Sequence, residues 1–133
     1  MRTRWFFVLV SLVILSLALA NCRQSSELTA ADAGYVLQLD VAPEPASVGT
    51  ATLQLTLLKE DGSPVDNAQI SVKGDMSHAG MAPVLGSAES GPDGIYTVPF
   101  EWTMAGDWIV TVDVTLADGT TFSDRFDLAV DGG

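Results

Sequence analysis

Cysteine and histidine are almost absent from this 133-residue sequence, which has a single residue of each, Cys22 and His78. One cysteine cannot form an internal disulfide, so a disulfide-stapled domain and a dithiol redox site are both excluded. A Ser-His-Asp triad would need His78 as its base, and no Gly-x-Ser-x-Gly elbow is present. Glu101 and Asp107 flank an expected turn, where solvated surface acids are common. We therefore predict that the protein is not an enzyme.

Basic residues are also scarce, since 6 Lys and Arg stand against 17 Asp and Glu and the formal net charge is −11. All of the acidic residues follow Cys22, and so do only four basic ones: Arg23, Lys59, Lys73 and Arg125. An acidic surface repels phosphate backbones, so a nucleic-acid partner is excluded. The acids are scattered along the chain, which is typical of a solvated face rather than of a metal cluster.

The beginning of the chain predicts export. A basic segment, Met1-Arg2-Thr3-Arg4, precedes an apolar run from Trp5 to Ala20, shorter than the roughly 20 residues of a spanning helix. Residues 1–21 are therefore a predicted signal peptide of the lipoprotein type, cleaved before Cys22. Leu19-Ala20-Asn21-Cys22 resembles a lipobox, although Asn21 stands where a small residue is usual, and Cys22 would carry the lipid.

The alternative is that the apolar run stays as an uncleaved N-terminal helix and anchors the protein directly. In both cases the rest of the chain faces an extracytoplasmic space, periplasmic or outer, and is anchored to the bacterial cell membrane. Residues 22–33 have little apolar content and no period, so we expect a flexible tether there. Residues 34–131 are long enough for one small domain and too short for two cores.

Alternation of apolar and polar residues predicts strands throughout that domain. The alternating runs are Tyr35–Val41, Thr52–Leu57, Ile70–Lys73, Tyr96–Trp102, Trp108–Leu116 and Phe122–Val130. Gly91-Pro92-Asp93-Gly94 and Ala117-Asp118-Gly119 are turn signals, and the second predicts that the last two strands form a hairpin. The pattern predicts an all-β fold, a single immunoglobulin-like antiparallel β-sandwich of about seven strands. Core packing is the favoured interpretation of Trp102 and Trp108.

Every methionine except the initiator falls in one of two short segments. Met76, His78 and Met81 lie in an expected loop after the third strand run, and Met104 lies in the expected turn before Trp108. Thioether and imidazole are ligands that the soft ion Cu(I) accepts. Residues two apart in an extended loop point to the same side, so Met76 and His78 would face one ion and Met81 would return across the bend. Met104 would join them if both turns meet at one end of the sandwich.

A tryptophan near such an ion would add a cation-to-ring contact and shield Cu(I) from oxidants. Trp102, two residues before Met104, is the nearer candidate in sequence. The alternative is that the methionines plug the open end of the sandwich as adaptable hydrophobes and that His78 is a surface residue.

The segments Met76-Ser77-His78-Ala79-Gly80-Met81-Ala82-Pro83 and Phe100-Glu101-Trp102-Thr103-Met104-Ala105-Gly106-Asp107-Trp108 resemble the FixH-related YtkA-like domain family. The resemblance covers most of residues 37–130. It implies an extracytoplasmic immunoglobulin-like domain, often membrane-tethered and associated with copper handling or cytochrome oxidase maturation. The family's Met/His loop falls on Met76, His78 and Met81, and its turn on Met104, Gly106 and Trp108. A second histidine is missing here, which argues against a Cu(II) site.

Two functions from different classes follow. The first is a membrane-tethered copper-binding or copper-delivery protein that holds Cu(I) with Met76, His78, Met81 and Met104, shielded by Trp102. Its partners would be the membrane and an envelope protein that accepts or donates copper. The second is a structural or partner-binding β-sandwich lipoprotein with no metal, whose Met-rich loop packs on another extracytoplasmic protein.

Overall fold

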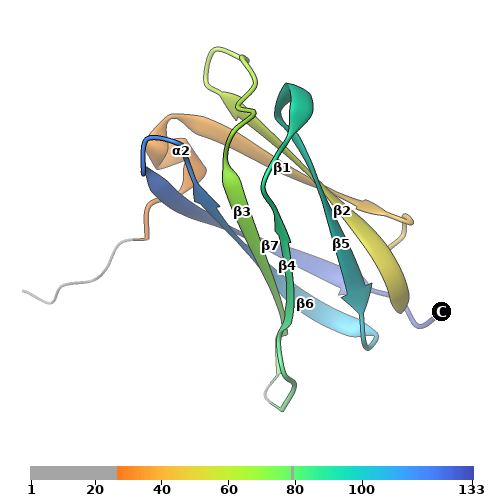
Figure 1. The fold of residues 1–133 in the computed structure, drawn as a ribbon. Coiled ribbons are helices and arrows are strands. Elements are labelled where there is room, and N and C mark those ends of the chain that lie inside the picture. Colours follow the sequence, from red (N-terminus) through yellow and green to blue (C-terminus); the bar gives the residue numbers. More distant parts are fainter. Residues whose placement is uncertain (1–26, 79) are drawn as a thin grey trace, which may run out of the picture.

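The computed structural model describes residues 27–78 and 80–133. Two antiparallel sheets lie face to face (Figure 1), one in the order β1-β2-β5 and the other in the order β4-β3-β6-β7. The prediction of a single antiparallel sandwich of about seven strands is confirmed. The signal peptide, the tether's first residues and Cys22 lie outside the described residues. The elements are α2 (Ala30–Ala33), β1 (Tyr35–Ala42), β2 (Gly49–Lys59), β3 (Gln69–Met76), β4 (Val84–Ala88), the 3₁₀ turn η2 (Pro92–Gly94), β5 (Ile95–Trp102), β6 (Gly106–Thr115) and β7 (Thr121–Val130).

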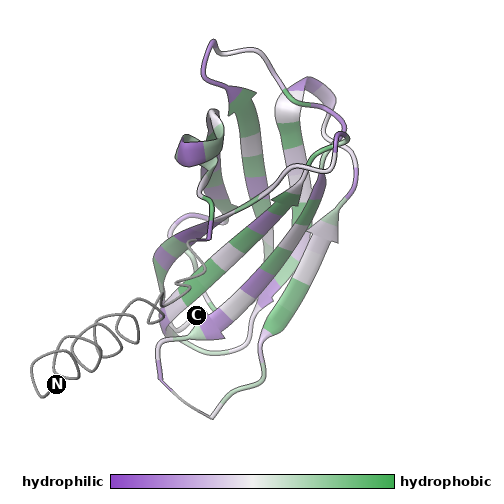
Figure 2. Ribbon diagram, turned by 90° about the vertical axis from the view of Figure 1, so that its left-hand side faces the viewer, coloured by the Kyte–Doolittle hydropathy of each residue, from purple (hydrophilic) through white to green (hydrophobic). Residues whose placement is uncertain are grey.

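The core follows the period of two that the strands show in the sequence. Apolar and polar residues alternate along the strands in Figure 2, so each sheet buries one face against the other. On β5 the buried residues are Tyr96, Val98, Phe100 and Trp102, and on β6 they are Trp108, Val110, Val112 and Val114. β6 and β7 pair as the predicted hairpin.

Phe100 crosses the space between the sheets. A Cβ placed on Gly74 of β3 would lie 2.6 Å from the ring carbon Cζ of Phe100 and 3.4 Å from Cε3 of Trp108. Only glycine therefore leaves room for this ring at that position, and the two sheets pack closely there.

Residues 29–33 differ from the predicted tether, because Ala30–Ala33 form a short helix, α2. Thr29 caps the helix, its hydroxyl accepting from the Asp32 N–H at 3.3 Å, while Gly34 ends it in the left-handed conformation. Ala30 is buried against the sandwich. The sequence does not predict this helix, since four residues are too few to show a helical period.

β4 is a second difference, because no alternating pattern in the sequence predicts a strand at Val84–Ala88. This five-residue strand pairs only with β3 on the sheet edge. A Cβ on Gly86 would lie 2.6 Å from Val98 and 3.3 Å from the carbonyl oxygen of Pro99, so β4 also lies close to β5 of the other sheet.

Among the residues that the structure describes, no helix is long and apolar enough to cross a membrane.

The sandwich has two distinct ends (Figure 1). We call one the methionine end; it comprises the β1–β2 connection (residues 43–48), the Met/His loop (77–83), the β5–β6 turn (103–105) and residues 131–133. We call the other the tyrosine end; it comprises α2 and the connections 60–68, 89–94 and 116–120.

Tyr96 closes the tyrosine end. Its hydroxyl accepts from the Ala68 N–H at 3.1 Å and donates to the Val65 carbonyl at 2.5 Å. Burial raises the pKa of Tyr96, so the phenol stays neutral and keeps its proton for Val65. The connection 60–68 is thereby fixed to the beginning of strand β5.

Candidate metal site

The Met/His loop and the β5–β6 turn lie together at the methionine end, as the sequence prediction requires. Met76, the last residue of β3, pairs in register with Trp108 of β6. The Ser77 N–H donates to the Asp107 carbonyl at 3.0 Å, directly after the β5–β6 turn. β3 and β5 belong to opposite sheets. The two segments therefore meet because β3 and β6 are hydrogen-bonded neighbours, not because β3 and β5 are.

Met104 sits in a turn that Trp108 holds in place. The indole Nε1–H of Trp108 donates to the Met104 carbonyl at 3.0 Å, while the Met104 residue itself is 46% exposed. A fixed backbone thus presents a half-exposed methionine.

Met76 is placed differently from the other candidate ligands. It ends strand β3 and is only 7% exposed, so its prediction as a loop residue is wrong. A Cβ on Gly106 would lie 2.8 Å from the Met76 methyl carbon, so this side chain reaches under the β5–β6 turn. The strand continues to Met76 because pairing with Trp108 satisfies its backbone.

His78 and Met81 lie in the Met/His loop itself. His78 is exposed, and Met81 is partly buried against the edge of the core. Met76 is in the core, whereas His78 is in solvent. His78, Met81 and Met104 are the three candidate ligands that solvent or the core margin can reach.

Trp102, the predicted shield, is a core residue with 0% exposure. Its ring packs edge-on against Trp108 at a centroid distance of 5.2 Å and against Phe100 at 4.9 Å. Trp108, also in the core, is the tryptophan whose indole N–H bonds to the Met104 turn. Sequence reasoning preferred Trp102 because it is nearer in the chain; the signal it missed is that a residue four positions on returns beside Met104 across a tight turn.

The candidate ligands at the methionine end differ in chemistry from an acidic metal site. Within residues 27–78 and 80–133, no three His, Cys, Asp or Glu residues gather closely enough to hold a metal ion. The candidate ligands supply thioethers and one imidazole, donor types that suit Cu(I) and do not suit Mg²⁺ or Ca²⁺. In the type of their donor atoms, the residues present fit the predicted ion.

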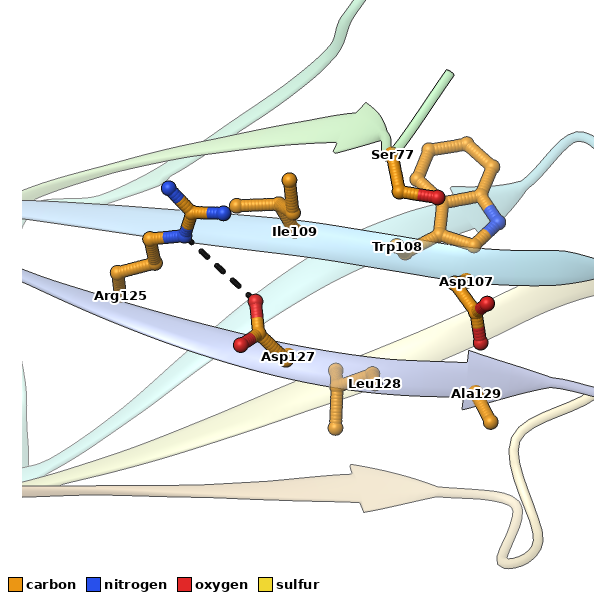
Figure 3. Close-up of a pocket in the computed structure, with 8 residues that line it drawn as sticks. All are labelled: Ser77, Asp107, Trp108, Ile109, Arg125, Asp127, Leu128 and Ala129. Atoms are coloured by element: carbon orange, nitrogen blue, oxygen red, sulfur yellow. Dashed lines mark ion pairs between the residues drawn. The ribbon is translucent and has the colours of Figure 1, made fainter.

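A shallow pocket on the outer face of β6 and β7 lies beside this end (Figure 3). Its lining includes Ser77, Asp107 and an exposed ion pair, in which Arg125 Nε lies 3.5 Å from Asp127 Oδ1. Exposed pairs of this kind contribute little to the stability of the fold. Neither methionine nor histidine lines the pocket, so it does not include the candidate ligands.

Comparison with known proteins agrees with the fold and with the resemblance seen in the sequence. The YtkA-like family pattern matches residues 29–113. No curated protein matches the sequence. Among solved structures, the Lin-41 filamin domain aligns with a TM-score of 0.50 and 12% identity, over 71% of this chain and 93% of that one.

Two other structures align less well. The soluble domain of PmoD from Methylocystis sp. has a TM-score of 0.48 and 12% identity, over 71% of this chain and 90% of that one. MtrC from Shewanella baltica has a TM-score of 0.45 and 17% identity, over 73% of this chain and 22% of that one. At 12% identity, the alignment with the Lin-41 filamin domain speaks to the fold alone, which is immunoglobulin-like.

Proposed function

The chain belongs to the YtkA-like family, and from that premise we propose that it is a membrane-tethered, extracytoplasmic, non-catalytic protein that binds Cu(I) at its methionine end. It would exchange the ion with another envelope protein, in a process such as cytochrome oxidase maturation. The tether would be the lipid on Cys22.

The observation that carries this proposal is the convergence of the two methionine segments. Ser77 is hydrogen-bonded to Asp107, and Trp108 is hydrogen-bonded to Met104. The beginning of strand β6 therefore contacts both the Met/His loop and the β5–β6 turn. Every methionine and the histidine that follow the initiator are thus at one end of the sandwich.

We assign His78, Met81 and Met104 as the ligands, because Cu(I) is satisfied by three soft donors. Met76, which the sequence prediction also included, packs beneath the turn and supports it. Trp108, rather than Trp102, holds the backbone of Met104. We propose that this site binds the ion and does not catalyse a reaction.

Anaerobic competition with a Cu(I) chelator tests the assignment on residues 23–133. We expect His78→Ala, Met81→Leu and Met104→Leu each to weaken Cu(I) binding by about tenfold or more, equal to about 1.4 kcal/mol. Leucine keeps the apolar volume and removes the thioether. Met76→Leu should bind like the wild type, and Val48→Ala, at an exposed apolar residue of the same end, is the matched control.

A wild type that loses its Cu(I) to a weak chelator would overturn the proposal, and so would ligand variants that bind as the wild type does. The alternative is a partner-binding sandwich without metal, and the exposed apolar residues Val48, Leu85 and Met104 favour it. Under that alternative, the Met→Leu variants keep their apolar surface and the fold while the wild type shows no Cu(I) binding.

A further inference from the structure

The N-terminal segment joins the sandwich at the tyrosine end. The Ser123 N–H donates to the Leu28 carbonyl at 2.8 Å, and the Ala30 N–H donates to Asp124 Oδ1 at 3.1 Å. Tyr35 then stacks on Phe122 with a centroid distance of 5.3 Å and begins β1 opposite the last residue of β2. The chain is thus fixed at this end from Leu28 onward.

The candidate ligands lie at the opposite end. β6 and β7 each run the full length between the two ends over 10 residues. At about 3.3 Å per residue, the two ends are separated by about 30 Å.

Residues 131–133 lie with the candidate ligands. The Val48 N–H donates to the Asp131 carbonyl at 2.9 Å, and the Asp131 N–H donates to the Ala46 carbonyl at 2.8 Å. A Cβ on Gly132 would lie 3.8 Å from that of Ala105, which neighbours Met104. An attachment at Gly133 would therefore place the methionine end against whatever carries the protein.

We propose that the tethered protein holds its methionine end away from the bilayer, so that its exchange partner is a protein whose metal site is exposed in the aqueous phase. This inference rests on the proposed function, because it takes the N-terminal tether and the Cu(I) site from it. The methionine end would not reach a partner whose metal site lies at the bilayer surface.

Chain length excludes the inverted orientation. Leu28 is six positions after Cys22, and six residue steps span at most about 21 Å when fully extended. An inverted sandwich would need its attachment point about 30 Å above the bilayer, which is farther than this segment reaches. Charge disfavours lying flat, because 17 acidic residues are repelled by anionic headgroups.

The experiment compares two attachments of residues 22–133 to maleimide lipids in vesicles that contain anionic lipid. Cys22 is the only cysteine of the chain, so its thiol gives one defined attachment. The matched variant, Cys22→Ser with Gly133→Cys, is attached at the methionine end. Both forms keep Trp102 and Trp108, which lie near that end, as fluorescent donors.

The first measurement needs no copper and records energy transfer from the tryptophans to dansyl-labelled lipid headgroups. We expect transfer to be several-fold stronger for the Gly133→Cys form than for the Cys22 form. Equal transfer in the two forms, or stronger transfer in the Cys22 form, would overturn the inference.

The second measurement follows release of Cu(I) to a water-soluble chelator and to the same chelator linked to lipid in the same vesicles. The Cys22 form should release Cu(I) to the soluble chelator as fast as the untethered protein, and several-fold more slowly to the lipid-linked one. Equal rates to both chelators would contradict the inference. If neither form holds Cu(I), the proposed function fails while energy transfer still decides the orientation.

Discussion

The two ends of the sandwich are closed in opposite ways. At the tyrosine end, the buried hydroxyl of Tyr96 both accepts and donates a hydrogen bond. At the methionine end, the buried Nε1–H of Trp102 has no hydrogen-bond partner among the described residues, and the flexible Met76 side chain fills the space under the turn. A fully satisfied polar group fixes one arrangement, whereas thioethers adapt to several.

The difference teaches where stability and binding are placed. The tyrosine end receives the chain from its N-terminal side and is held by specific hydrogen bonds and close glycine contacts. The methionine end carries exposed soft donors on two segments tied to one strand. We therefore expect the largest losses of stability from changes at the tyrosine end, and losses of Cu(I) binding from changes to the candidate ligands of the methionine end.

The largest expected effect is that of Gly94→Ala at the tyrosine end. Gly94 has φ +74°, and a Cβ there would lie 2.5 Å from the Leu57 carbonyl oxygen. Backbone strain and overlap with a backbone atom should together cost about 3 kcal/mol of unfolding free energy and lower Tm by about 10 °C or more. Thermal melting followed by circular dichroism measures this.

Gly119→Ala is the matched control, because Gly119 has φ +89° but no atom within 4 Å of its added Cβ. It introduces the strain without the overlap. If Gly94→Ala were no more destabilising than Gly119→Ala, the close packing of the tyrosine end would be refuted.

The next effect is that of Tyr96→Phe, which leaves the Ala68 N–H and the Val65 carbonyl without their phenol. Unpaired buried groups cost about 1–3 kcal/mol, so the free energy of unfolding, measured by urea denaturation, should fall by that amount. Cu(I) affinity should not change. Tyr35→Phe removes a hydroxyl from a partly exposed tyrosine and serves as the control; a loss of equal size in both variants would contradict the comparison.

A smaller effect separates the two tryptophans of the methionine end. Trp108→Phe removes the donor to the Met104 carbonyl, whereas Trp102→Phe removes a donor that has no partner in the described part of the chain. Both variants lose a similar ring area, so the free energy of unfolding of Trp108→Phe should be about 1 kcal/mol lower than that of Trp102→Phe. NMR of the Met104 methyl group should show greater motion in Trp108→Phe alone. Equal motion in both variants would mean that Trp108 does not hold the turn.

The smallest effect is acid sensitivity at the tyrosine end. Hydrogen bonds from Ser63 hold the pKa of Asp61 below its usual value, and the backbone N–H of Thr120 does the same to the pKa of Asp118. The unfolded chain therefore binds more protons in acid, so this stabilisation is complete above the unfolded pKa and is lost as pH falls through the folded one. The double variant Asp61→Asn, Asp118→Asn should show a flatter fall of Tm in acid; an unchanged slope would count against it.

Much of the fold could be predicted from the sequence because strand patterns are local. Tyr96, Val98, Phe100 and Trp102 alternate with polar residues and are all buried. β4 could not be predicted in this way, because it is short, lies at an edge and contains Gly86, which packs against the other sheet. α2 could not be predicted either, since its stability comes from a cap and from Asp124, 94 residues away.

The candidate site was predicted in part. The chemistry of Met81, His78 and Met104 is readable from residue type, and the contact of Ser77 with Asp107 places the two segments that carry them at one end of the sandwich. The position of Met76 was not predictable, because its burial depends on pairing with Trp108. Binding of Cu(I) by these residues stays a prediction.

The sequence by itself determined the class of the fold, the acidic surface and the soft chemistry of the methionine segments, because composition and a period of two are local properties. The tertiary structure alone decided which methionine is buried, which tryptophan holds the Met104 turn and that the N-terminal segment joins the end opposite the candidate ligands. Those outcomes depend on the pairing of β3 with β6 and of residue 28 with β7, contacts between residues far apart in the chain that no local pattern encodes.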